Sequence, residues 1–134
     1  MTEQTNARPQ GTDIVRLTDL AAQLLGQAKA HQSQRAAQTI HSGSSMRATV
    51  IALAAGAELA EHESPPAATL QVISGRVRLL WGDQEALLRD GEITDIPPHR
   101  HALKSLTDAV VLLTVARTER SKRRRDQVPC PPSP

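Results

Sequence analysis

The chain has 134 residues and a formal net charge of +2, and its only aromatic side chain is one tryptophan. This length is enough for one domain but not comfortably for two. The scarcity of aromatic rings excludes a stacking surface for single-stranded nucleic acid and disfavours an aromatic-lined sugar site, so the core must be built from Leu, Val, Ile and Ala.

The positive charge is concentrated at the C-terminal end. From Thr118 onward, five basic residues stand against two acidic ones, a net +3, which leaves −1 of the total +2 for the rest of the chain. We expect residues 118–134 to be a disordered basic, proline-rich tail and residues 1–13 a disordered N-terminus. The basic run Lys122–Arg125 allows a weak, salt-sensitive contact with DNA, although most such termini are simply solvated.

The single cysteine, Cys130, lies in this tail, so no internal disulfide is possible. That agrees with a reducing compartment. We find neither a signal peptide nor an apolar run long enough to cross a membrane. The expectation is a cytoplasmic protein with no membrane partner.

Residues 17–30 are predicted to form a short amphipathic helix, because Leu17, Leu20, Leu24 and Ala28 recur at helical spacing. Thr18 or Asp19 is expected to cap it. The helix is expected to cover one end of a β-core. A DNA-reading helix-turn-helix would need a second patterned helix, and the polar segment that follows does not supply one.

After residue 35 the apolar pattern changes towards a period of two, and short segments alternate with turn residues. No helical crossover separates them, so a parallel α/β sheet is excluded, and turns every 8 to 12 residues favour an all-β sandwich or barrel. We place one domain over residues 14–117, with the barrel over about 35–117. The predicted strands are 38–41, 46–55, 58–63, 67–74, 76–81, 85–88, 92–96, 102–106 and 110–116.

Two turn regions carry a family pattern. In the first, Gly56 is followed by His62 and then by Gly75. This spacing resembles the first motif of the cupins, which are small antiparallel double-sheet jelly-roll barrels of the RmlC-like superfamily. The resemblance also identifies two departures, because Ser64 stands where the motif has its second histidine and Ala68 where it has a glutamate.

The second region runs from Gly91 through Pro97 to His101 and resembles the second cupin motif. The segment 108–116 resembles the closing strand of many single-domain bacterial cupins. The resemblance covers about residues 46–117. It implies an antiparallel jelly-roll barrel with one short N-terminal helix, and a homodimer. A complete cupin metal site has three histidines and a glutamate, so the metal motif here is degenerate.

The histidines allow two interpretations. If His62, His99 and His101 converge, three imidazoles can bind one divalent transition metal, Zn, Ni, Fe or Cu. Alternatively, His62 and His101 hydrogen-bond each other or the backbone inside a metal-free pocket, and His99 is solvated. His31 and His41 match no motif position and are expected at the surface.

Three functions remain open. The first is a small-molecule-binding or sensing cupin with a barrel pocket, in which metal is absent or weakly bound. The second is a metal-dependent enzyme of the oxygenase or isomerase type, and the third is a regulatory protein whose tail contacts DNA. The sequence therefore does not decide whether the chain is an enzyme. For the first function, the predicted ligand-binding residues are His62, Ser64, Trp81, Arg100 and His101.

Overall fold

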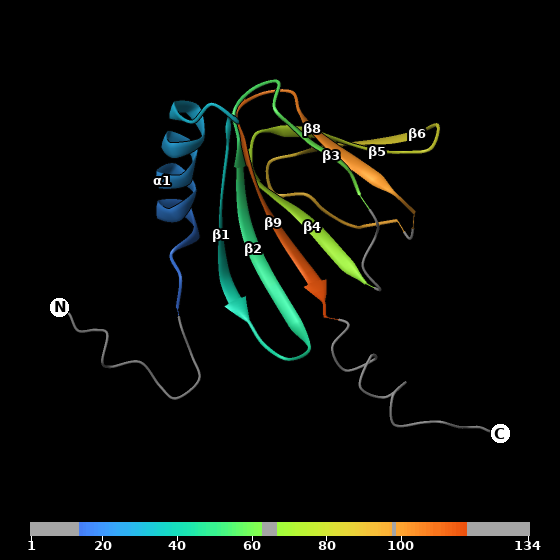
Figure 1. Ribbon diagram of the computed structural model, residues 1–134, viewed down its shortest axis with the longest axis horizontal. Coiled ribbons are helices and arrows are strands. Elements are labelled where there is room, and N and C mark those ends of the chain that lie inside the picture. The colour runs from blue at the N-terminus through green and yellow to red at the C-terminus, as the bar shows by residue number, and fades with distance from the viewer. Residues whose placement is uncertain (1–13, 63–66, 98, 118–134) are drawn as a thin grey trace.

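The computed structural model describes residues 14–62, 67–97 and 99–117. These residues contain one helix and nine strands, and the strands form two facing sheets (Figure 1). The five-stranded sheet has the order β1-β2-β9-β4-β7 and the four-stranded sheet the order β3-β8-β5-β6. All strand pairs are antiparallel, which confirms the predicted double-sheet jelly roll with one helix. The elements are α1 (Leu17–Ala30), β1 (Arg35–Ser42), β2 (Met46–Leu53), β3 (Glu58–His62), β4 (Ala68–Ser74), β5 (Arg76–Trp81), β6 (Gln84–Arg89), β7 (Ile93–Asp95), β8 (His101–Ser105) and β9 (Ala109–Ala116).

Aliphatic side chains fill the space between the two sheets. In β5, Val77 and Leu79 are buried in this core and Arg76 is exposed, as the alternation of a strand requires. Trp81, on the same face as Val77, packs against the core and is half-buried. The chain thus builds its core almost without aromatic rings, as its composition predicts.

Strand β2, which lies between β1 and β9, is buried on both faces over its second half, residues 50–53. Val50 and Ala52 belong to the cluster beneath α1, whereas Ile51 and Leu53 belong to the core between the sheets. Because the helix covers one face of the sheet and the second sheet covers the other, this strand is apolar at successive positions rather than at alternate ones.

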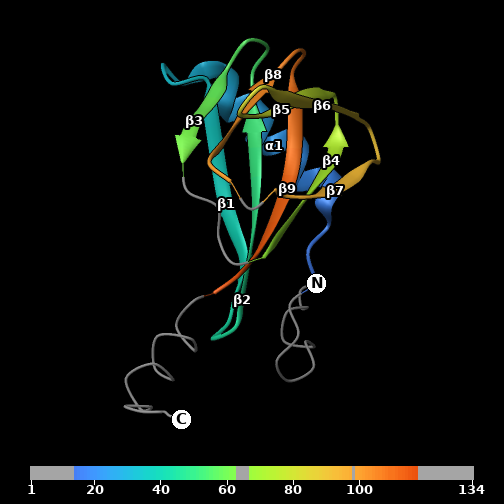
Figure 2. The same ribbon diagram turned by 90° about the vertical axis from the view of Figure 1, so that its right-hand side faces the viewer.

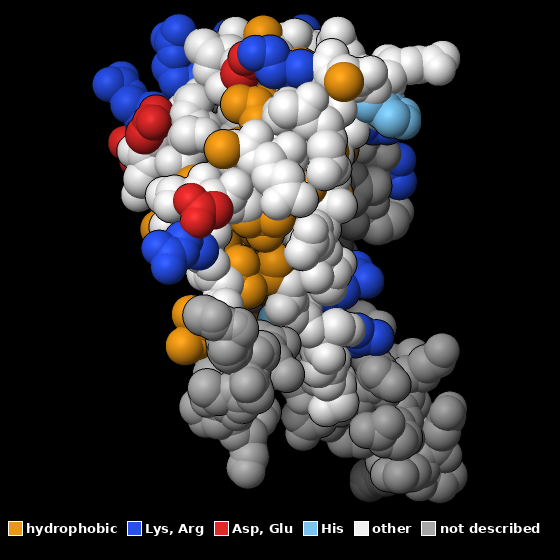
Figure 3. Space-filling model, turned by 90° about the vertical axis from the view of Figure 1, so that its left-hand side faces the viewer, with side chains coloured by type: hydrophobic (Ala, Val, Ile, Leu, Met, Phe, Trp, Pro, Cys, Tyr) orange, Lys and Arg blue, Asp and Glu red, His pale blue; other side chains and the backbone are white. Residues whose placement is uncertain are grey.

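Helix α1 lies along the outer face of the five-stranded sheet (Figure 2), so the prediction that it covers one end of the β-core is wrong. An apolar stripe that runs the length of a helix needs an equally long apolar surface, which strand ends do not offer. Figure 3 shows this side of the molecule, where hydrophobic side chains reach the surface among charged ones. Among the described residues, no helix has the length and hydropathy needed to cross a membrane. The buried residues of α1 are Leu20, Ala21, Leu24 and Ala28.

The predicted helix cap is also wrong. Arg16 occupies the N-cap position with an extended backbone, and no side chain caps the helix. Thr18 and Asp19 lie inside the first turn, whereas a capping side chain must precede it. Asp19 instead forms an exposed ion pair with Arg16, with 3.3 Å between Oδ2 and Nε, and its negative charge near the helix N-terminus is favourable.

Strand β1 begins at Arg35 rather than at the predicted Gln38, because it pairs with β2 along its whole length. The predicted glycine turns are confirmed, and Gly75 is the most constrained of them. Its φ is +95°, and a Cβ there would collide with the Asp108 carbonyl oxygen and the Cα of Ala109. Only glycine fits this turn between β4 and β5.

Two side chains fix the loops at this end of the sandwich. The fully buried Ser105 hydroxyl donates to the Ala54 carbonyl oxygen at 2.7 Å and thereby holds the turn between β2 and β3. Asp108 Oδ1 accepts a hydrogen bond from the Ala55 backbone N–H at 2.9 Å, and its Oδ2 lies 3.2 Å from Lys29 Nζ. The bond from Ala55, and after it the bond to Lys29, lower the pKa of Asp108 below the ordinary aspartate value.

We predict that Gly75→Ala and Gly26→Ala change stability in opposite directions. Gly75→Ala should lower the free energy of unfolding by about 2–4 kcal/mol, because it combines an unfavourable φ with a backbone collision. Gly26 is exposed inside α1 with nothing within 4 Å of an added Cβ, so Gly26→Ala should raise it by about 0.5–1 kcal/mol. Urea unfolding measures both, and equal effects would contradict the geometry at Gly75.

We also predict that Asp108 makes stability depend on pH. Its folded-state pKa is lowered, so its contribution is complete above the ordinary aspartate pKa and is lost as the pH falls through the folded-state value. Asp108→Asn should therefore be less stable than the wild type at neutral pH, and the two stabilities should converge in acid. Urea unfolding at several pH values tests this, with the exposed Asp83→Asn as control. A difference that does not change with pH would refute it.

Candidate functional site

The two motif histidines lie opposite each other at the ends of neighbouring strands. His62, the last residue of β3, is the Cα partner of His101, the first residue of β8, after an irregularity in the register. The side chain of His62 and the whole of Ser64 fall outside the described residues. The pairing therefore brings the two backbone positions together, as the cupin motifs imply.

His101 is buried, with 4% of its surface exposed. Its Nδ1 lies 3.0 Å from the His99 carbonyl oxygen, and because a carbonyl only accepts, Nδ1 carries the proton. In the neutral ring, Nε2 then carries the lone pair that can accept a hydrogen bond or bind a metal. This backbone contact fixes both the tautomer and the orientation of the ring.

The imidazole borders a small cavity between the sheets. The cavity measures about 20 Å³, which is room for about one water molecule. Among the residues that the structure describes, His101 is the only polar side chain that lines it. The other lining residues are Ile51, Leu59, Leu70, Leu79, Ile96, Leu103 and Leu113.

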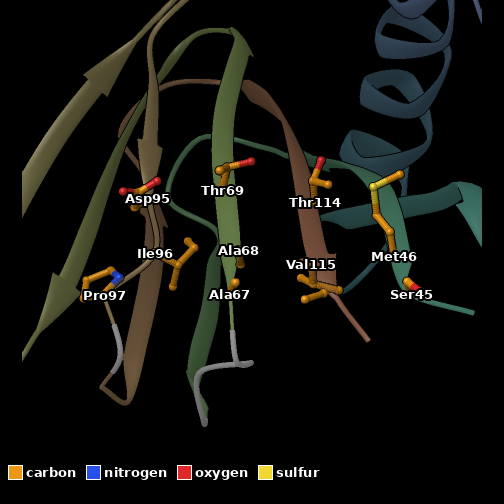
Figure 4. Close-up of a pocket in the computed structure, with 11 residues that line it drawn as sticks. Ser45, Met46, Ala67, Ala68, Thr69, Asp95, Ile96, Pro97, Thr114 and Val115 are labelled. Atoms are coloured by element: carbon orange, nitrogen blue, oxygen red, sulfur yellow. The ribbon is translucent and has the colours of Figure 1, made fainter. Parts of the chain in front are cut away.

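A much larger groove of about 700 Å³ crosses the ends of β2, β9, β4 and β7 (Figure 4). Ile96 lines both this groove and the cavity of His101, so the two spaces share one wall residue. Ala68, which replaces the motif glutamate, also lines the groove. The remaining lining residues are Ser45, Met46, Ala67, Thr69, Asp95, Pro97, Thr114, Val115 and Ala116.

The other predicted residues gather elsewhere. Trp81, His99 and Arg100 line a separate hollow of about 590 Å³, together with Asp83 from the turn between β5 and β6 and Gln84 at the start of β6. His99 and Arg100 are exposed. Of the predicted ligand-binding residues, Trp81 and Arg100 therefore line this hollow, whereas His101 lines the inner cavity.

The described residues do not make a metal centre. Within residues 14–62, 67–97 and 99–117, no three His, Cys, Asp or Glu side chains lie close enough to hold one ion. His99 lines the outer hollow and His101 the inner cavity, and Ala68 supplies no carboxylate. The predicted set of His62, His99 and His101 stays a prediction, because one of its side chains is not described. His31 and His41 are exposed, as expected.

Sequence reasoning did not single out the groove residues Ile96 and Val115 or the hollow residues Asp83 and Gln84. Ile96 directly precedes Pro97 of the second motif, and this position is the sequence signal that could have identified it. The hollow follows from the pairing of Leu80 with Ala102, which brings the β5–β6 turn next to the segment before β8. No local pattern in the sequence contains that pairing.

No protein-family model matches this chain, and no curated protein does. Solved structures are similar to it. A cupin-superfamily protein from Desulfitobacterium hafniense has a TM-score of 0.63 at 17% identity, over 81% of this chain and 94% of that one. An RmlC-like cupin from Shewanella frigidimarina has a TM-score of 0.56 at 20% identity, over 61% and 75%.

A conserved protein of unknown function from Streptococcus pyogenes has a TM-score of 0.59 at 25% identity, over 65% of this chain and 77% of that one. Similarities at this level of identity establish a fold and not an activity. The same fold follows independently from the two antiparallel sheets, from their strand order and from the positions of the motif glycines at turns. The chain has the fold of the RmlC-like cupins.

Proposed function

We propose that this protein binds or senses a small, largely apolar organic molecule at the open end of the sandwich, with His101 as the polar contact. The observation that carries the proposal is the position of His101, a buried imidazole of fixed tautomer in an otherwise aliphatic cavity next to a large groove. Burying a polar ring costs free energy unless the ring is hydrogen-bonded, and the bond to the His99 carbonyl oxygen holds this ring beside the cavity.

The groove supplies the space that the interior lacks. Its volume of about 700 Å³ lies within the range of small-molecule sites, whereas the cavity has room for only one small group. The body of a ligand would therefore lie in the groove, and a hydroxyl-sized group would reach past Ile96 to His101. This arrangement replaces the barrel pocket that the sequence suggested.

The lining favours an uncharged ligand. Ala68, Ile96 and Val115 offer aliphatic surface, and Asp95 is the only ionisable side chain among the described residues that line the groove. The His101 imidazole is the polar group beside the cavity, so a hydroxyl on the ligand is the complementary group. An apolar ring or chain that carries one hydroxyl fits both features.

The metal-dependent enzyme remains a second hypothesis, favoured by the opposed backbone positions of His62 and His101. Directly opposed residues in an antiparallel pair have their Cβ atoms about 4.5–5.5 Å apart. The DNA-contacting tail and the homodimer stay predictions. The tail begins at residue 118, outside the described residues.

We predict that His101→Leu leaves the fold intact and weakens ligand binding. Leucine resembles histidine in size and fills an aliphatic surrounding, so the free energy of unfolding should stay within about 1 kcal/mol of the wild type or rise. If His101 had a purely structural role, its replacement would instead lower the free energy of unfolding by about 2 kcal/mol or more. Urea unfolding decides between these roles, and the exposed His41→Leu is the control.

Binding is tested with cyclohexanol as the probe. Nuclear magnetic resonance titration of the full chain should show saturable shifts at Ala68, Ile96 and Val115 and at the His101 ring. His101→Leu should weaken binding by about tenfold, and His41→Leu should leave it unchanged. Shifts scattered over the surface, or equal affinity in His101→Leu and wild type, would refute the proposal.

Metal analysis separates the first two hypotheses. We predict that protein purified without an affinity tag carries well below one equivalent of transition metal per chain, because two of the four cupin ligand positions are Ser64 and Ala68. One tightly bound equivalent that disappears in both His62→Ala and His101→Ala would support the metal-dependent enzyme instead. The exposed His31→Ala is the matched control.

A further inference from the structure

We infer that the outer face of the four-stranded sheet binds an acidic segment of a partner protein, one that combines several carboxylates with an aliphatic side chain. This face lies on the side of the sandwich away from α1, which covers the other sheet (Figure 1). Among the described residues that line the groove or the cavity of His101, none belongs to this face. The inference therefore does not depend on the proposed function.

Strand alternation determines which side chains point outward from this sheet. In β5, Leu79 is buried in the core between the sheets, so Arg78 points the opposite way. The same alternation, with buried leucines as their neighbours in the chain, turns Arg89 of β6 and Lys104 of β8 outward. We call this surface the basic face. Its charged residues are Glu58, Arg76, Arg78, Glu85, Arg89 and Lys104.

The register of the sheet places like charges opposite each other on the basic face. Arg76 of β5 pairs with Arg89 of β6, and Arg78 pairs with Lys104 of β8. Directly opposed residues have their Cβ atoms about 4.5–5.5 Å apart, and like charges in this position destabilise a sheet. Arg78 has an ion pair with Glu85, with 3.5 Å between Nε and Oε1. Within the part of the chain that the structure describes, no ion pair involves Arg76, Arg89 or Lys104. An anionic group from outside can therefore relieve this repulsion.

The excess of positive charge is specific to this face. Its four cations stand against two carboxylates, a net +2, whereas residues 1–117 together carry −1. The segment from Thr118 onward is itself basic, so it does not complement the face. Two copies of the face repel each other, which disfavours a symmetric dimer through this surface. The complementary partner is therefore an acidic molecule other than this chain.

Aliphatic side chains among the cations favour a protein as that partner. Leu87, directly opposite Arg78, is 54% exposed, and the half-buried Leu80 lies on the same face. An acidic protein segment can cover this surface with an aliphatic side chain of its own, whereas a phosphodiester backbone has none to offer. The only aromatic residue, Trp81, lies on the core-facing side of β5, so the face offers no ring on which nucleic-acid bases could stack.

A short peptide with four glutamates around one leucine is the probe. Nuclear magnetic resonance titration of the full-length protein should give saturable shifts at the amides of β5, β6 and β8, with half-saturation at about 1 mM. The matched peptide with four glutamines should bind at least about tenfold more weakly. Raising the salt concentration from about 20 to about 200 mM should weaken the binding of the glutamate peptide severalfold. Replacing its leucine by alanine should weaken binding by about threefold.

The variant Arg89→Gln separates binding from stability. It should weaken binding of the glutamate peptide by about fivefold or more, because it removes one of the cations without an ion pair. It should also raise the urea midpoint of unfolding, because it removes the like charge opposite Arg76. A residue with a purely structural role would instead lower the midpoint on replacement. The matched control is Arg47→Gln, which changes an exposed arginine in β2 of the other sheet and should leave binding unchanged.

The inference is overturned if the glutamine peptide binds as well as the glutamate peptide, if the shifts lie outside the basic face, or if Arg89→Gln binds like the wild type. A lower urea midpoint for Arg89→Gln would refute the argument from like charges. A DNA duplex or a phosphatidylserine vesicle that binds this face more tightly than the peptide, at equal anionic charge, would also overturn it, in favour of a nucleic acid or a membrane.

Discussion

Strand β9 is the constraint on which the rest of the structure depends. It pairs with β2 along one edge and with β4 along the other. This strand therefore joins segments that lie far apart in sequence. Val111 faces the core between the sheets and Val110 the helix, and both are fully buried. The strand therefore holds α1, the five-stranded sheet and the interior in one unit, which makes the fold depend on long-range pairing.

The same unit explains where ligand sites can form. With almost no aromatic rings, Leu, Val, Ile and Ala side chains fill the core between the sheets, and His101 borders a small cavity there. Larger spaces occur where strands end, at the groove near Ile96 and at the hollow near Trp81. His99 links the hollow near Trp81 to the cavity of His101, because its side chain lines the hollow and its carbonyl oxygen orients the His101 ring.

The residues that fix the turns and the residues of the proposed site lie at opposite ends of the strands. Gly75, Ser105 and Asp108 fix the turns at one end through close backbone approach and hydrogen bonds. His101, Ala68 and Ile96 lie towards the other end, where β8 begins and β4 starts. Changes at the proposed site can therefore leave the turns that stabilise the sandwich intact.

The sequence by itself determined the fold class and most strands, because period-two patterns and turn glycines are local signals. It also indicated that His62 and His101 are matched positions, since the motif spacing is local too. Tertiary structure alone decided that α1 covers a sheet face, that aliphatic packing nearly closes the interior, and that His99 and His101 line different spaces. Those outcomes depend on which strands pair and on how side chains from both sheets share one volume, and neither is encoded in the order of neighbouring residues.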